Sequence, residues 1–326
     1  MQEIELKFQI PAESLAGLSA DIERLPGHDR EHLQAHYVDT PDRRLGQARS
    51  ALRLRKEGER WVQTLKTSGA NTMIRLEDNQ AAPPPAEGQP ARVDLGLHRG
   101  TPAEAALTRI LGWHPEQDRR GEQAGLVELY RTDIWRHSAR LEIGPGTPHA
   151  GVVELALDLG HIHAGHLSVP VRELEIELVQ GHAMAVIDCA RDWVMHHALW
   201  LDTQTKAHRG DRLARQAEGA TALQAKAASD TRPLELSLAQ HLEQTTEAMS
   251  EVAASPLPEH RQVEAWQQAL QGLITLVTAH PGQLPPQATH QVIDLSQALQ
   301  SSGSPSALAR SPSTTVLCLD LFAALL

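Results

Sequence analysis

The chain opens with MQEIELKFQI (residues 1–10), and the segment EIELKF within it alternates strictly between charged and apolar residues. Successive side chains of a β-strand point to opposite faces, so Glu3, Glu5 and Lys7 share one face of a strand and the apolar residues share the other. A lone strand of this pattern is ordinarily half-buried, with a solvated charged face. The rest of the sequence decides whether that interpretation holds here.

Composition limits the classes of protein to consider. At 326 residues the chain has room for two domains, and a hydrophobic content of 41% is sufficient for packed cores. The net charge of −11 argues against a general nucleic-acid or membrane-surface binder, since those partners attract basic proteins. The two cysteines lie far apart and are interpreted as free thiols of a reducing compartment. No signal peptide or membrane span is predicted, so a cytoplasmic protein is expected.

Residues 1–212 are predicted to form one unit of short strands separated by turns. The strand candidates, in order, are EIELKFQI, HYVDT, ALRLRKE, RWVQTLKT, MIRLED, ARLEIG, VVELALDL and VRELEIEL. Three helices are expected among them, in ESLAGLSADIERL, PAEAALTRILGW and AMAVIDCARDWVMHHALW. The predicted fold of this part is therefore an antiparallel sheet or barrel with peripheral helices, which makes the chain α+β.

The chain changes character after residue 212. Residues 213–233 are rich in Ala and Gln without strong periodicity and are predicted to be a linker. Residues 234–326 carry helical patterns, and their last segment, LFAALL, is apolar. Such an end must be buried against the strands, the other helices or a second copy of the chain. A homo-oligomer formed through these helices is therefore one expectation.

Charged residues recur on one face of the other strand candidates and are sorted by sign. Acidic residues occupy that face in the late strands, at Glu154, Asp158, Glu173, Glu175 and Glu177. Between residues 43 and 75, by contrast, nine basic residues stand against two acids. Solvated faces ordinarily mix the two signs, so this segregation favours a charged interior over a charged surface.

A closed antiparallel barrel explains the segregation, because inward side chains alternate with outward ones on each strand. Buried charges are costly unless they are paired or bound to ions. Clustered carboxylates suit hard divalent cations such as Mg²⁺ or Mn²⁺, and a set of Arg and Lys side chains suits phosphates. The pattern therefore predicts an interior that holds a polyphosphate and its metal ion, the components of phosphoryl transfer by electrostatic stabilisation.

These residues resemble the CYTH family, the triphosphate tunnel metalloenzymes. The hallmark of that family is an ExExK strand, here residues 3–7. Further family-like segments follow in the expected order: YVDTPDRRL (37–45), ALRLR (51–55), TLK (64–66), RLE (75–77), TDIWR ending at Arg136, ELALDLG (154–160), ELEIEL (173–178) and TKAHRG (205–210). Within the family the likeness is to bacterial inorganic triphosphatases, which carry a CHAD helical domain after the catalytic one. The helical region here resembles the start of a CHAD domain but is much shorter.

The resemblance implies an eight-stranded tunnel that hydrolyses inorganic triphosphate to pyrophosphate and phosphate with Mg²⁺ or Mn²⁺. It assigns catalysis to Glu3, Glu5 and Lys7 of the first strand. The metal ligands that it implies, in order of preference, are Glu3, Glu5, Glu173, Glu175, Glu154 and Asp158. The triphosphate-binding residues that it implies are Lys7, Arg53, Arg55, Lys66, Arg75, Arg136 and Lys206.

Three other functions stay open at this point. A thiamine or nucleoside triphosphatase would use the same tunnel, but Trp61 is the only tryptophan among the basic strands to stack on a ring. A class IV adenylate cyclase, also of this family, needs a pocket for ribose and adenine that nothing in the sequence indicates. The third is a non-catalytic polyphosphate sensor or scaffold, which a replaced Glu3 or Glu5 would have favoured.

Several residues have plainer interpretations. Glu177 lies at a strand end and is the acid of its strand most suited to a structural role. The segment HIHAGH (161–166) is expected in a solvated hairpin, because no cysteine or carboxylate spacing completes a zinc site. His196 and His197 fall on a predicted helix and are interpreted as boundary residues.

Overall fold

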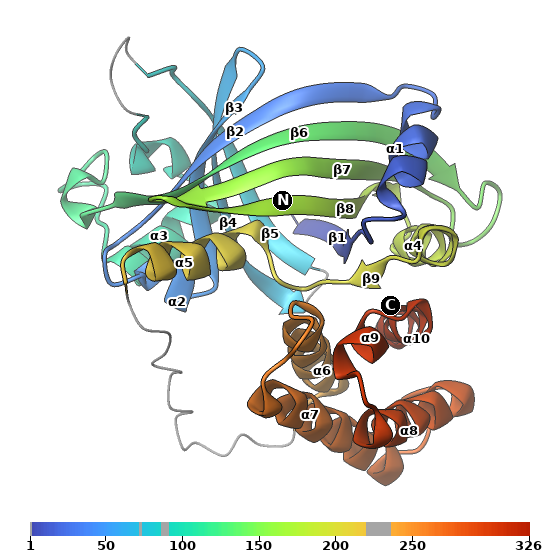
Figure 1. The fold of residues 1–326 in the computed structure, drawn as a ribbon. Coiled ribbons are helices and arrows are strands. Elements are labelled where there is room, and N and C mark those ends of the chain that lie inside the picture. Colours follow the sequence, from blue (N-terminus) through green and yellow to red (C-terminus); the bar gives the residue numbers. More distant parts are fainter. Residues whose placement is uncertain (1, 72–73, 86–90, 220–235) are drawn as a thin grey trace.

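A curved antiparallel sheet and a group of helices packed beside it make up the fold (Figure 1). We describe it from a computed structural model, over residues 2–71, 74–85, 91–219 and 236–326. The strands are β1 Gln2–Gln9, β2 Asp29–Asp39, β3 Ser50–Glu57, β4 Arg60–Asn71, β5 Ile74–Ala82, β6 Val127–Ile143, β7 Gly151–Ala164, β8 Leu167–Gly181 and β9 Trp200–Leu201. The α-helices are α1 Leu15–Glu23, α2 Arg44–Gln47, α3 Pro102–Leu111, α4 Met184–His197, α5 Lys206–Ala217, α6 Leu238–Ala253, α7 His260–Ala279, α8 Pro286–Ser301, α9 Pro305–Ala309 and α10 Pro312–Ala323.

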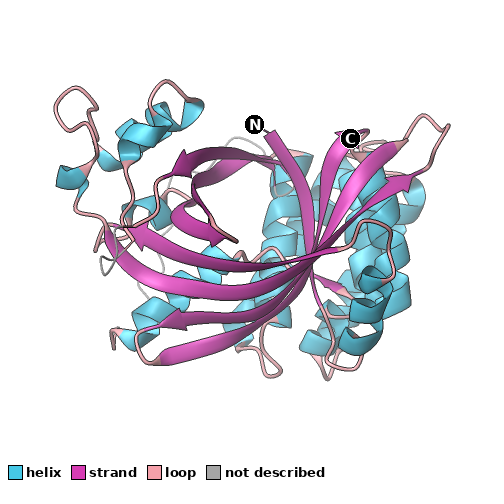
Figure 2. Ribbon diagram, turned by 90° about the horizontal axis from the view of Figure 1, so that it is seen from above, coloured by secondary structure: helices cyan, strands magenta, loops and turns pink. Residues whose placement is uncertain are grey.

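The strands follow the order β5-β4-β3-β2-β6-β7-β8-β1-β9, and every described pair is antiparallel. Strand β1 joins the two ends of this order, because Glu5–Gln9 pair with β8 while Gln2–Ile4 pair with β5. Among the described residues, three pairs make the β1–β5 contact, and the sheet curls into a tunnel (Figure 2). The predicted antiparallel tunnel is confirmed, with a ninth strand of two residues added beside Phe8 and Gln9.

The late strands are longer than the sequence pattern predicted. Strand β6 has 17 residues, and the predicted segment ARLEIG forms only its end. Strands β6 and β7 approach closely at Gly160, where an added Cβ would lie 2.0 Å from the carbonyl oxygen of Asp133. His161 and His163 are exposed, as expected, but they lie on β7 itself, and the hairpin turn follows Ala164. Glycine at residue 160 therefore permits the close pairing of these two strands.

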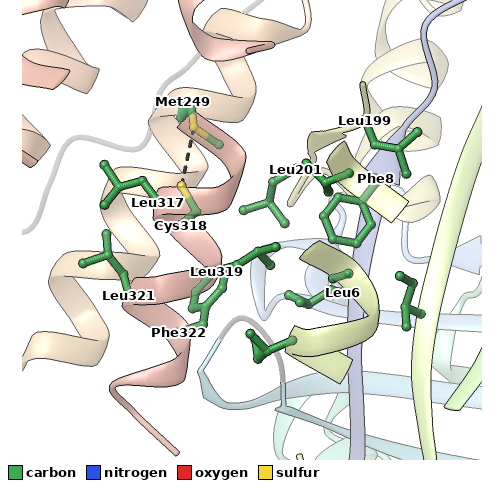
Figure 3. Packing of buried hydrophobic residues seen from close by; sticks show 14 of the residues in the cluster. Leu6, Phe8, Leu199, Leu201, Met249, Leu317, Cys318, Leu319, Leu321 and Phe322 are labelled. Atoms are coloured by element: carbon green, nitrogen blue, oxygen red, sulfur yellow. Dashed lines mark hydrogen bonds between the residues drawn. The ribbon is translucent and has the colours of Figure 1, made fainter. Parts of the chain in front are cut away.

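The helical region shares a hydrophobic core with the strands. Leu319 and Phe322 of α10 belong to the same buried cluster as Phe8 of β1 and Leu201 of β9 (Figure 3). Of the covering surfaces considered for the apolar C-terminal segment, the structure shows the strands and the other helices. Helix α5 also continues past residue 212, where the sequence pattern placed a domain boundary.

Polar contacts reinforce this junction. The amide N–H of Leu201 donates to the Thr315 hydroxyl at 3.2 Å, and Arg191 of α4 forms a salt bridge with Asp320 of α10. Within the described part of the chain, no helix is both long enough and apolar enough to cross a membrane.

Candidate active site

A cavity of about 1040 Å³ lies inside the curved sheet, and charged side chains dominate its wall. The strands and α5 contribute sixteen of these residues to it: Glu5, Lys7, Asp39, Arg53, Arg55, Lys66, Glu77, Arg136, Glu154, Asp158, Glu175, Glu177, Lys206, Asp211, Arg212 and Arg215.

The opening strand shows how the alternation creates this wall. Glu5 and Lys7 line the cavity, whereas Leu6 and Phe8 point the other way into the hydrophobic core, with exposed fractions of 2% and 0%. The predicted inward-facing charge is therefore confirmed for these residues. The side chain of Glu3 falls outside the part that the structure describes, as does that of Arg75.

A basic wall is formed by β3 together with β6. Arg53 donates to the Tyr37 hydroxyl at 3.2 Å, and Arg55 donates through Nε to Glu57 at 2.7 Å. Burial lowers the pKa of Arg55, and the neighbouring charges of Arg53 and Arg136 lower it further. Guanidinium groups that repel one another in a partly dry site are stabilised when an anion binds between them.

Lys206 lies at the centre of the most compact charge cluster in the cavity. Its Nζ lies 2.6 Å from Asp158 and 2.8 Å from Glu175, and it also pairs with Glu173. Arg136 donates two hydrogen bonds to Asp158, at 2.6 and 2.7 Å, and one to Glu175 at 2.6 Å. Burial opposes ionisation here, but the opposite charges hold the pKa values of Asp158 and Glu175 below their ordinary range and that of Lys206 above it.

The start of α5 positions Lys206. Thr205 caps the helix, and its hydroxyl accepts from the backbone N–H of His208 at 3.0 Å. Gly210, one turn further on, packs directly against the ring of Tyr130, and an added Cβ would lie 2.3 Å from that ring. The glycine therefore lets α5 lie close enough to the sheet for Lys206 to reach the cavity.

Lys7 and Glu173 form a second, deeper charge cluster. Lys7 Nζ lies 3.3 Å from Asp202 and 3.9 Å from Glu173, and it donates to the backbone carbonyl of Gln204. Burial is the main cause of a lowered pKa for Lys7. Glu173 is fully buried, pairs with Arg209 as well, and is not among the residues that line the cavity. Glu173 therefore lies behind the cavity wall as a buried anchor for cationic side chains.

A row of three carboxylates crosses β7, β8 and β1. Glu177 lies opposite Glu154 on one side and opposite Glu5 on the other. Glu177 makes no hydrogen bond or salt bridge with a residue that the structure describes. Burial raises its pKa to about 7, and the charges of Glu5, Glu77 and Glu154 contribute to the increase against the opposing effect of Lys66. Glu154 pairs with Arg140 at 3.0 Å, and it is at Glu177 that negative charge is incompletely balanced.

Two sets of carboxylates can be compared as places for a divalent cation. Asp158, Glu173 and Glu175 each offer an oxygen within 4.8 Å of the others, but the Lys206 ammonium already lies among them. In the row that contains Glu177, Lys66 lowers the pKa of Glu177, but burial and the neighbouring carboxylates outweigh this effect, so added positive charge is stabilising there. Carboxylate oxygens are the donors that Mg²⁺ and Mn²⁺ prefer, so the residues present fit these ions.

The helical region also contributes to the cavity wall. Glu243, Glu247 and Glu251 follow one face of α6 at four-residue intervals, and all three line the cavity. Arg49 forms salt bridges with the first two, at 2.8 Å in the case of Glu243, while His208 Nε2 lies 3.6 Å from Glu251. The sequence pattern indicated the helix but not that its acidic face reaches the cavity.

The structure brings most of the predicted site residues together. Those that line the cavity are Glu5, Lys7, Arg53, Arg55, Lys66, Arg136, Glu154, Asp158, Glu175 and Lys206. Glu173 lies behind them, and the side chains of Glu3 and Arg75 fall outside the description. The sequence analysis gave Glu177 a structural role, but its side chain lines the cavity. The signal in the sequence was that Glu177 lies two residues after Glu175 and so shares its face of β8.

Comparison with known proteins identifies the family. The model of the CYTH domain matches residues 1–210, and the chain therefore belongs to the CYTH family. An inorganic triphosphatase of Haemophilus influenzae is 26% identical over 215 residues, which are 64% of this chain and 54% of that protein. The chain thus spans about half the length of this relative.

Two solved structures are similar in fold. One is a candidate adenylyl cyclase from Hippeastrum, described as having a dominant triphosphatase activity, with 18% identity, a TM-score of 0.45 and coverage of 64% of this chain and 95% of that one. The other is a candidate adenylate cyclase from Bacillus halodurans, with 20% identity, a TM-score of 0.39 and coverage of 64% and 96%.

Proposed function

We propose that the protein hydrolyses inorganic triphosphate to pyrophosphate and phosphate, with Mg²⁺ or Mn²⁺ held by carboxylates of the tunnel. The observation that carries this proposal is a single cavity in which Arg and Lys side chains and clustered carboxylates converge. The name of the Haemophilus influenzae relative, inorganic triphosphatase, supports the same reaction.

The basic residues would bind the phosphate oxygens. Arg53 and Arg55 present planar guanidinium groups that match phosphate oxygens in pairs. Asp158 and Glu175 orient Arg136 and Lys206 through the hydrogen bonds described above. The complete set proposed for triphosphate is Lys7, Arg53, Arg55, Lys66, Arg75, Arg136 and Lys206.

The acidic residues would hold the metal ion. Glu5, Glu154 and Glu177 form a row of adjacent carboxylates, with unbalanced negative charge at Glu177, and Glu3 joins them as predicted from the sequence. Asp158, Glu173 and Glu175 would become ligands only after Lys206 leaves its place among them. When bound, the ion supplies neutralisation of the phosphate charge and Lewis acidity for the attacking water.

The contribution of the chain itself is positioning and electrostatic stabilisation. The buried salt bridges of Arg136 hold its guanidinium in place before a substrate arrives. Charge that develops on the leaving pyrophosphate would therefore meet donors that need little reorganisation. Lys7 and Glu5, on alternate positions of β1, place a cation and a carboxylate side by side at the same wall.

The lining favours a naked polyphosphate over a substrate with an aromatic ring. The Tyr, Trp and Phe residues of the described lining are Tyr37 and Tyr130, and they stack on each other with ring centroids 4.7 Å apart. Trp61, which the sequence analysis considered for stacking, does not line the cavity. A thiamine or adenine ring would therefore find little aromatic surface to contact.

A substrate comparison tests this proposal. The full chain would be given inorganic triphosphate, thiamine triphosphate or ATP with Mg²⁺, and phosphate release would be measured for each, with cyclic AMP measured for ATP. We expect the highest kcat/KM for inorganic triphosphate. A higher value for thiamine triphosphate or ATP would reassign the substrate, and cyclic AMP formation would indicate a cyclase. Binding of triphosphate without release would favour the polyphosphate sensor.

A further inference from the structure

Outside the tunnel, Asp21 of α1 meets two histidines at the end of α4. Nε2 of His197 lies 3.4 Å, and Nε2 of His196 lies 3.6 Å, from the same Asp21 Oδ2. Hydrogen bonds of the N–H···O type are shorter, about 2.7–3.2 Å. The three side chains are therefore brought together without direct hydrogen bonds between the histidines and the carboxylate.

The two distances to Asp21 Oδ2 match the separation of neighbouring ligands around a tetrahedral metal ion. Nitrogen and oxygen ligands about 2.0–2.2 Å from zinc lie about 3.3–3.6 Å apart in a regular tetrahedron. One ligand atom from each of Asp21, His196 and His197 lies within 4.8 Å of the other two. The two imidazole rings are nearly perpendicular, at an angle of 81° with centroids 4.5 Å apart. Their nitrogens therefore approach the carboxylate from different directions.

Neighbouring residues fix two of the three groups. Arg24 donates to Asp21 Oδ1 at 2.7 Å, which orients the carboxylate and leaves Oδ2 toward the histidines. His197 is only 7% exposed and packs against the ring of Trp193. His196 is 73% exposed, so its side chain can adjust to a bound ion. Preorganised ligands with an oriented carboxylate are typical of metal sites.

The electrostatics also suit metal binding. Burial lowers the pKa of His197, and His196 lowers it further, while Asp21 opposes this effect. A lowered pKa favours the neutral imidazole, which is the form that ligates metals.

We propose that Asp21, His196 and His197 form a second metal site, for a transition metal ion and specifically Zn²⁺, separate from the tunnel. Two imidazole nitrogens and one carboxylate oxygen suit Zn²⁺, whereas the carboxylates of the tunnel suit Mg²⁺ or Mn²⁺. Because His196 is 73% exposed, water would reach a bound ion and complete its coordination. A bound ion would join α1 to the end of α4 and stabilise their packing.

Zinc titration of the full chain tests this site. The protein would be freed of metal and titrated with Zn²⁺ by calorimetry in excess Mg²⁺, which occupies the tunnel carboxylates. We expect one Zn²⁺ per chain for the wild type and a loss of affinity of at least about tenfold for His196→Ala. His196 is so exposed that its removal leaves the fold intact. His163→Ala is the matched control, because His163 belongs to another exposed histidine pair, with His161.

Cobalt provides an independent readout. Co²⁺ in place of Zn²⁺ should give the intense visible absorption of a tetrahedral site in the wild type and in His163→Ala, but not in His196→Ala. Absence of Zn²⁺ binding by the wild type, equal affinity of His196→Ala, or loss of binding only in His163→Ala would each overturn the site. None of these results depends on the reaction in the tunnel, so they leave the proposed triphosphatase activity to its own test.

Discussion

Glu5 on β1 and Glu177 on β8 are directly opposite each other in the sheet. Like charges at opposed positions destabilise a pair of strands. Burial raises the pKa of Glu177 to about 7, and Glu5, Glu77 and Glu154 contribute to this shift. A divalent cation at this row would remove the repulsion, which connects the stability of the fold with the proposed metal site.

The first prediction concerns the pH dependence of stability in metal-free protein. The pKa of Glu177 is about 7 in the folded protein and about 4.5 in the unfolded chain. Between these two pH values the folded state therefore binds more protons than the unfolded state. Its free energy of unfolding should therefore fall as pH rises through this window. Glu177→Gln should reduce the slope, which urea unfolding at several pH values measures. Added Mg²⁺ should also reduce the slope in the wild type.

Glu142→Gln is the control for this series, because Glu142 is an exposed acid of β6, which is separated from β8 by β7. It should leave the pH dependence unchanged. If the free energy of unfolding has the same slope against pH in the wild type and in Glu177→Gln, Glu177 is not the cause of the pH dependence.

The second prediction concerns Lys206, which balances Asp158, Glu173 and Glu175. Lys206→Met removes the ammonium and leaves buried carboxylates without it. Loss of one partner from a buried ion pair costs about 3–5 kcal/mol, so the free energy of unfolding should fall by that amount. Lys56→Met is the matched control, since Lys56 is half-buried and does not line the cavity. Equal losses in urea unfolding for the two variants would contradict a special role for Lys206.

The third prediction concerns the acidic face of α6. Glu243 and Glu247 line the cavity and form salt bridges with Arg49. They therefore repel a polyanion and also neutralise an arginine that would attract it. The double variant Glu243→Gln/Glu247→Gln should lower KM for triphosphate by about two- to fivefold, with little change in kcat. Glu264→Gln removes an exposed acid of α7 away from the cavity and should have no effect. An unchanged or higher KM in the double variant would exclude this influence of α6.

The fourth prediction concerns the junction between the tunnel and the helices. Phe322 is buried in the core that also contains Phe8 and Leu201, so Phe322→Ala should cost about 3–5 kcal/mol. Because one core joins the two parts, activity and tryptophan fluorescence should be lost in the same urea transition. Exposed Leu326 provides the control, as Leu326→Ala. Activity that survives the unfolding of the helices would show that the tunnel is stable on its own.

The sequence was sufficient to predict the direction of the charged side chains. The period of two in β1 assigns Glu5 and Lys7 to one face, and the structure confirms that this face lines the cavity. The period follows from strand geometry alone, so tertiary contacts do not alter it. The antiparallel pairing was predicted from short strands separated by turn residues, whereas the order of the strands in the sheet was not predicted.

The depth and the cationic partners of the individual acidic residues on β8 were not predictable. Alternation places Glu173, Glu175 and Glu177 on one face but does not say how deep each lies or which cation approaches it. Lys206 and Arg209 reach Glu173 from α5, about thirty residues later in the chain. These two contacts hold Glu173 behind the cavity wall, whereas Glu177 lines the cavity.

The docking of the C-terminal helices was also beyond the sequence. An apolar end such as that of α10 must be covered, but its composition does not identify the covering surface. The packing of Leu319 and Phe322 beside β1 and β9 depends on the whole fold (Figure 3). The same docking brings the acidic face of α6 to the cavity.

The most direct test of the proposed function is the initial rate of phosphate release from inorganic triphosphate, with Mg²⁺ or Mn²⁺ and with a chelator. Arg55→Ala and Arg60→Ala would be measured beside the wild type, because Arg55 lines the cavity and Arg60 is 78% exposed on the adjoining hairpin. We predict release that requires the metal, a kcat/KM about 10–100-fold lower for Arg55→Ala, and a normal value for Arg60→Ala. Release that persists with chelator, or no release by folded wild-type protein, would contradict a metal-dependent triphosphatase in this tunnel.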